Sequence, residues 1–116
     1  MRNSALIIAH RHTAGFLEAR ARAGSGSHGE VLASFLESDV QGDLVTARAL
    51  LDEVGAAQRG ERSRPGGVGN AYSIAIGPDG AVIRNAVLEN ALPERYSLAD
   101  LRAALETWIG AIEDAR

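Results

Sequence analysis

The chain has no cysteine and no lysine, and both absences restrict what it can be. Without cysteine it has neither a disulfide framework nor a thiolate metal site, and a reducing compartment suits it. All 12 basic residues are arginines, and the formal net charge is −3. Because binding to a phosphate backbone uses clustered basic residues, this charge argues against nucleic acid as a direct partner.

Long apolar runs are also missing. The run over residues 5–9 stops at His10 and is too short for the core of a signal peptide. Nothing approaches the roughly 18 consecutive apolar residues of a membrane span. We therefore expect a cytoplasmic protein without a membrane partner.

The residues that are present fit one folded domain. A chain of 116 residues with 46% hydrophobic and 23% charged residues is long enough to bury a core but too short for two. We expect a single domain over residues 1–116. Proline and glycines crowd the segment 60–69, which predicts a flexible loop there.

The segment 69–112 has the clearest pattern. Tyr72, Ile74 and Ile76 alternate with small residues, as in a half-buried strand. The turn residues 77–80 (Gly-Pro-Asp-Gly) and the β-branched segment 81–88 complete a predicted hairpin.

A capped amphipathic helix follows. Ser97 is placed to cap it, and Asp100 lies in its first turn, where the helix dipole favours an anion. Its predicted buried stripe consists of Leu98, Leu101, Leu105, Trp108, Ile109 and Ile112.

Two further strands are predicted near the N-terminus, over residues 4–10 and 16–23. In the second, Leu17, Ala19 and Ala21 alternate with charged residues. An extended chain would bury one face there, whereas a helix would scatter the charges around its cylinder. We therefore predict a strand paired with the first.

Two helices lie between the predicted hairpins. Ser27 to Glu30 reads as a capping box, Gly42 as a stop, Asp43 as the cap of the second helix and Gly60 as its end. The order β-β-α-α-β-β-α predicts an α+β fold in which an antiparallel four-stranded sheet carries its helices on one face.

Histidines and carboxylates supply the candidate sites. His10 and His12 share a strand face, but no third ligand stands nearby because His28 begins another element, so we expect neither a metal nor a cofactor. His12 and Glu18, across the proposed hairpin turn, form the candidate acid–base pair if the protein is an enzyme.

A larger group of carboxylates around the helix–helix junction predicts an acidic docking surface for a basic protein. Its members are Glu37, Asp39, Asp43, Asp52 and Glu53.

Several stretches resemble known families. They are residues 31–40 (VLASFLESDV), residues 69–72 (GNAY), Asp79-Gly80, and the segment from Ser97-Leu98 to Trp108-Ile109. Together they resemble the small YacL-like bacterial proteins and the immunity proteins of contact-dependent inhibition and related polymorphic-toxin systems. The resemblance covers about residues 27 to 112 and carries no catalytic signature.

The resemblance implies a cytoplasmic, non-enzymatic protein that neutralises a cognate toxin domain, often a ribonuclease, by direct contact. One alternative is a YacL-like housekeeping domain without a toxin partner, forming a homodimer through its sheet. Another is a small enzyme or metal protein that uses His10, His12 and Glu18.

Overall fold

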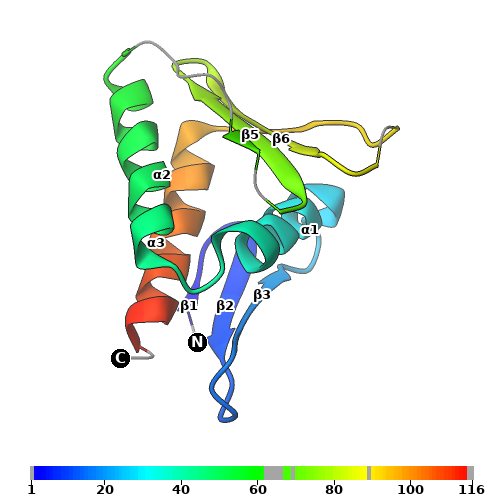
Figure 1. Ribbon diagram of the computed structural model, residues 1–116, viewed down its shortest axis with the longest axis vertical. Coiled ribbons are helices and arrows are strands. Elements are labelled where there is room, and N and C mark those ends of the chain that lie inside the picture. Colours follow the sequence, from blue (N-terminus) through cyan, green and yellow to red (C-terminus); the bar gives the residue numbers. More distant parts are fainter. Residues whose placement is uncertain (1, 62–66, 69, 89, 115–116) are drawn as a thin grey trace.

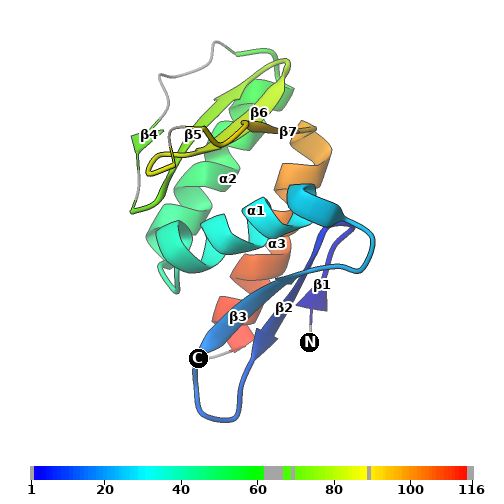
Figure 2. The same cartoon turned by 90° about the vertical axis from the view of Figure 1, so that its right-hand side faces the viewer.

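Two separate antiparallel sheets pack with three α-helices in the computed structural model, which describes residues 2–61, 67–68, 70–88 and 90–114 (Figures 1 and 2). The first sheet contains β1 (Arg2–Asn3), β2 (Ile7–Arg11) and β3 (Leu17–Ala21). The second contains β4 (Gly67–Val68), β5 (Tyr72–Gly77), β6 (Gly80–Asn85) and β7 (Glu94–Tyr96). The helices are α1 (Gly26–Phe35), which continues into the π-helical segment η1 (Leu36–Val40), α2 (Leu44–Gln58) and α3 (Leu98–Asp114).

The prediction of one four-stranded sheet with helices on one face is wrong. The fold remains α+β, but among the described residues the strands of each half pair only within their own half. Each hairpin buries its apolar face against the helices, so the two do not need to meet edge to edge. Strand β4 lies inside the predicted flexible loop 60–69 and pairs with Ser73 and Ile74 of β5.

Both predicted hairpins are confirmed. β2 pairs with β3 in a register that places His10 opposite Glu18, so the alternating segment is a strand despite its helix-forming residues. β5 pairs with β6 across the turn at Pro78 and Asp79, with Gly77 opposite Gly80.

Two of the predicted helix caps are confirmed and one is wrong. Asp43 accepts from the Val45 N–H at 3.0 Å, and Ser97 accepts from the Asp100 N–H at 3.0 Å. The capping box at Ser27 does not form, because α1 begins at Gly26 and the Ser27 hydroxyl donates to a distant side chain.

One core is shared by both sheets and all three helices. Trp108 of α3 is 1% exposed, and fully buried side chains come from the first sheet (Ile7), the second (Ile83) and α1 (Leu32). The predicted stripe of α3 is therefore confirmed, apart from the half-buried Leu98. None of the described helices has the length and apolar character needed to cross a membrane.

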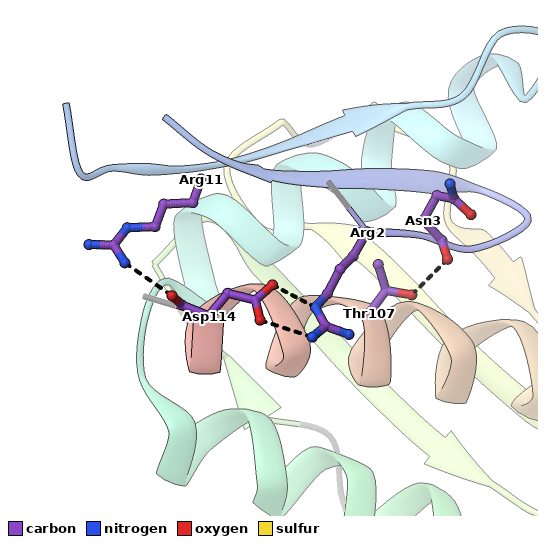
Figure 3. A network of polar contacts seen from close by, with 5 residues as sticks. All are labelled: Arg2, Asn3, Arg11, Thr107 and Asp114. Carbon is purple, nitrogen blue, oxygen red and sulfur yellow. Dashed lines mark hydrogen bonds and ion pairs between the residues drawn. The ribbon is translucent and has the colours of Figure 1, made fainter. Parts of the chain in front are cut away.

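Polar contacts tie the N-terminal strand to the end of α3 (Figure 3). The Arg2 guanidinium donates two hydrogen bonds to the Asp114 carboxylate, at 2.8 and 2.9 Å. Arg11 donates to the Asp114 carbonyl oxygen at 3.3 Å, and Thr107 donates to the Asn3 carbonyl oxygen at 3.2 Å. These contacts fix the first sheet against the last helix.

Candidate functional site

The π-helical segment η1 lies between the two sheets and sends one carboxylate to each. Glu37 accepts from the Ala19 N–H of β3 at 3.0 Å. Asp39 accepts from the Ala71 N–H at 3.1 Å and from the Tyr72 N–H, where β5 begins, at 3.0 Å. Each carboxylate thus accepts from backbone N–H groups that have no partner within the sheets. Losing such a hydrogen bond is costly, because the N–H group would be left without an acceptor in the folded protein.

Neighbouring side chains complete this arrangement, which we call the η1 junction. Asn70 donates to the Ser38 carbonyl oxygen at 2.7 Å, and the Tyr72 hydroxyl donates to the Ser34 hydroxyl at 2.8 Å. The indole N–H of Trp108 donates to the carbonyl oxygen of Gln41, just after η1, at 2.7 Å. The junction thus joins η1, the start of β5 and α3.

Three of the five carboxylates predicted as a docking surface accept hydrogen bonds from backbone N–H groups. Glu37 and Asp39 belong to the η1 junction. Asp43 caps α2, and the hydrogen bond from the Thr46 hydroxyl is the main cause of its lowered pKa. Asp52 and Glu53 lie on α2, roughly 13–15 Å along the helix from Asp43. The docking surface stays a prediction, and three of its five members also hold backbone N–H groups of the chain itself.

The predicted His12–Glu18 pair is brought together on the outer face of the first sheet. His12 Nε2 lies 2.8 Å from Glu18 Oε1, and the Arg20 guanidinium donates to the same oxygen at 3.2 Å. The hydrogen bond with His12 is the main cause of the lowered pKa of Glu18, while burial opposes it. The His12 ring stacks on Phe16 and meets the edge of His10.

This pair borders a cavity of about 270 Å³, lined by Ile8, His10, His12, Glu18 and Arg20. Glu18 orients the imidazole through one ring nitrogen and leaves the other for proton transfer, the usual arrangement of a general acid–base pair. The lining residues include no hydroxyl or thiol nucleophile. Within the described part of the chain, no group of three or more His, Asp or Glu side chains is arranged to hold a metal ion.

A second His–Glu contact was not predicted. The Glu94 carboxylate accepts from the Ser27 hydroxyl at 2.8 Å and lies 3.2 Å from His28 Nδ1. The His28 ring stacks on Tyr96, whose hydroxyl donates to the His28 carbonyl oxygen at 2.6 Å. Burial raises the pKa of Tyr96, and the Ser27 hydrogen bond is the main cause of the lowered pKa of Glu94.

This cluster joins α1 to β7 and does not form a nucleophile–base–acid chain. In such a chain the hydroxyl contacts the imidazole, whereas here the Ser27 hydroxyl contacts the carboxylate. Glu94 is more than sixty residues from both partners in the sequence. No local pattern could have indicated the contact, and the capping-box reading of Ser27 pointed elsewhere.

Comparison with known proteins adds no relative: no protein-family model, curated protein or solved structure matches the chain.

Proposed function

We propose that the chain is a cytoplasmic immunity protein that binds a toxin domain, a nuclease, and neutralises it by direct contact without catalysis. The observation that carries this proposal is the η1 junction. Six of the residues in which the chain resembles immunity proteins lie in it. They are Ser34, Ser38, Asp39, Asn70, Tyr72 and Trp108.

All of these side chains hydrogen-bond to backbone groups or to one another. Shared residues whose side chains hold the backbone in place form a scaffold. Such a scaffold leaves the exposed positions free to differ between family members. Proteins that each recognise their own toxin need this division, because an interface gains its affinity from a few exposed anchor residues. An active site would instead require shared polar groups directed into a cavity.

Co-expression with the toxin domain encoded immediately upstream tests the proposal. We expect the chain to restore growth and to co-purify with the toxin as a one-to-one complex. A chain that neither restores growth nor binds the toxin would disprove it.

A variant at Asp39 tests the scaffold role of the η1 junction. Asp39→Asn should lower the stability of the chain, while the folded variant binds the toxin with the wild-type dissociation constant. If Asp39→Asn abolishes binding at unchanged stability, the junction is a recognition site and not a scaffold.

A second candidate, a small acid–base enzyme, is favoured by the 2.8 Å contact between His12 and Glu18. The two functions differ in stoichiometry. A binding protein stops the toxin only at one equivalent or more. An enzyme that inactivates the toxin acts at catalytic amounts, and this effect is lost in His12→Gln. Titrating the purified chain against toxin activity separates them, and we expect an endpoint at one equivalent.

A further inference from the structure

Two arginines lack partners within the described residues. Arg84 and Arg95 make no hydrogen bond or ion pair there, and both are exposed. Every other described arginine has a partner, either a carboxylate, a carbonyl oxygen or an amide. Those arginines are Arg2, Arg11, Arg20, Arg22, Arg48, Arg59 and Arg102.

Arg84 and Arg95 lie on the same face of the second sheet. Along β6, Ala81 and Ile83 are buried toward the helices, so Val82 and Arg84 point outward. The register places Arg95 of β7 opposite Val82. Arg84 and Arg95 are therefore diagonal neighbours, about 7–8 Å apart at their Cα atoms. In a chain of net charge −3, these two arginines carry positive charge that no ion pair among the described residues compensates.

The same strands lead into an apolar projection. The β6–β7 connection extends away from the helices (Figure 1), and its described residues expose Val87 by 70%, Leu88 by 62% and Leu92 by 85%. Asn85 shapes its start, because its side-chain oxygen accepts from the Val87 and Leu88 N–H groups at 2.9 Å each. We call Val87, Leu88 and Leu92 the apolar arm.

We propose that the apolar arm and the two arginines form one docking surface for an acidic protein surface, an apolar pocket flanked by carboxylates. Buried aliphatic anchors would supply affinity, and the arginines, each able to bind a carboxylate through two hydrogen bonds, would supply orientation. A cavity of about 280 Å³ lies beside Arg95 and the β5–β6 turn, and its lining also includes Asp79. It offers room for an apolar side chain of the partner, whereas the partner's carboxylates would contact the arginines.

Other occupants fit this surface less well. Single-stranded nucleic acid is bound by aromatic stacking and many cations, whereas the arm is aliphatic and the face holds two arginines. A symmetric dimer through this face would bring the same patch of both copies together and set arginines against arginines. An acidic protein partner satisfies both the charge and the apolar surface.

The identity of the partner rests on the proposed function. If the partner is a nuclease toxin, its nucleic-acid cleft is basic, so the acidic surface that this face contacts lies outside that cleft. Docking there would hold the chain beside the cleft rather than imitate its substrate.

The test compares three double variants in binding to the upstream-encoded toxin domain. We expect Arg84→Glu with Arg95→Glu, and separately Leu88→Ser with Leu92→Ser, to raise the dissociation constant at least about tenfold. Arg48→Glu in α2 with Arg59→Glu, directly after α2, makes the same change of charge elsewhere and should leave affinity within about threefold. Thermal unfolding should be near wild type in the first two variants, because the altered side chains are exposed. The control variant should unfold at a slightly lower temperature, because it also breaks the exposed ion pairs Arg48–Glu113 and Arg59–Glu61.

The outcomes separate the two proposals. A wild-type complex that all three variants form equally well overturns the docking surface and leaves the immunity function standing. If the wild type does not bind the toxin, the immunity function fails, and a labelled peptide of alternating glutamate and leucine tests the surface alone. The surface is then supported if the wild type binds this peptide and the arginine variant does not. Binding to neither probe, or to a 15-nucleotide RNA in place of the peptide, overturns it.

Discussion

Glu37 and Asp39 are two residues apart, yet they contact different sheets. Residues at positions i and i+2 of an α-helix differ by roughly 200° around its axis, and in the wider π-helix they still point to nearly opposite sides. A helical segment lying between two sheets can therefore serve both, and η1 does so with carboxylates. At the residue scale, apparent surface charges thus act as acceptors for backbone N–H groups.

This role predicts a stability cost for Asp39→Asn. An asparagine has one acceptor oxygen, so one of the two backbone N–H groups of Ala71 and Tyr72 would lose its partner and face an NH₂ group. We expect a loss of about 1–3 kcal/mol in the free energy of unfolding, measured by urea denaturation. Asp52→Asn, on the exposed side of α2, is the matched control and should stay within about 0.5 kcal/mol. Equal effects of both variants would contradict the assignment.

Glu18 predicts a pH dependence with a defined sign. Its pKa is lowered in the folded chain, mainly by the hydrogen bond with His12. The folded state therefore stabilises the ionised carboxylate more than the unfolded state does. The stability it contributes is complete above its ordinary pKa of 4.5 and is lost as the pH falls through its lower folded value.

The comparison of wild type with Glu18→Gln measures this contribution. We expect the wild type to have the higher urea midpoint at pH 6 to 7, and the difference to shrink toward zero as the pH falls below 4. A difference that is constant or grows on acidification would be inconsistent with the contact.

At the scale of elements, the π-helix ends in an unusual backbone conformation. Gln41 has φ 57° and ψ −147°, a region that is essentially restricted to glycine. The sequence indicated a stop at Gly42, one residue later. The conformation is held in place because the Gln41 carbonyl oxygen accepts from Trp108 while its side-chain amide donates to the Ser38 carbonyl oxygen.

Glycine usually makes a protein less stable than alanine does at the same position, and at Gln41 we predict the reverse order of stability. Both Gln41→Gly and Gln41→Ala lose the side-chain hydrogen bond, but only glycine relieves a backbone strain of about 1–3 kcal/mol. We expect the glycine variant to be more stable than the alanine variant by about 1–2 kcal/mol in urea denaturation, after allowing for the greater chain entropy of glycine. An alanine variant at least as stable as the glycine variant would refute the strain.

Local patterns predicted the elements better than their assembly. Alternation identified β3, and side-chain chemistry identified the caps at Asp43 and Ser97, because these depend on residues a few positions apart. The Glu94–Ser27 contact joins residues 67 positions apart, and the contacts that link the two sheets through η1 join residues 18 to 33 positions apart. No local pattern reports either. Of the candidate sites, the His12–Glu18 pair was found because one hairpin turn brings it together.

At the scale of the whole molecule, the two sheets form one structural unit although they share no strand. Their buried residues belong to a single cluster with those of the helices. Cutting the molecule between the sheets would expose apolar side chains such as Ile7 and Ile83 on either side, and solvation of such surface costs about 25 cal/mol per Å². The sheets should therefore not unfold separately.

This continuity predicts a single cooperative transition. The only tryptophan, Trp108, is buried in the shared core, so its fluorescence reports core packing while far-UV circular dichroism reports the helices. We expect both probes to give the same urea midpoint.

Ile7→Ala in the first sheet and Ile83→Ala in the second, both fully buried, should each destabilise the chain by about 2–5 kcal/mol. Hydrogen exchange of the β5 and β6 amides should then accelerate in Ile7→Ala as much as in an equally destabilised Ile83→Ala. Protection of those amides that survives in Ile7→Ala would show that the second sheet folds independently.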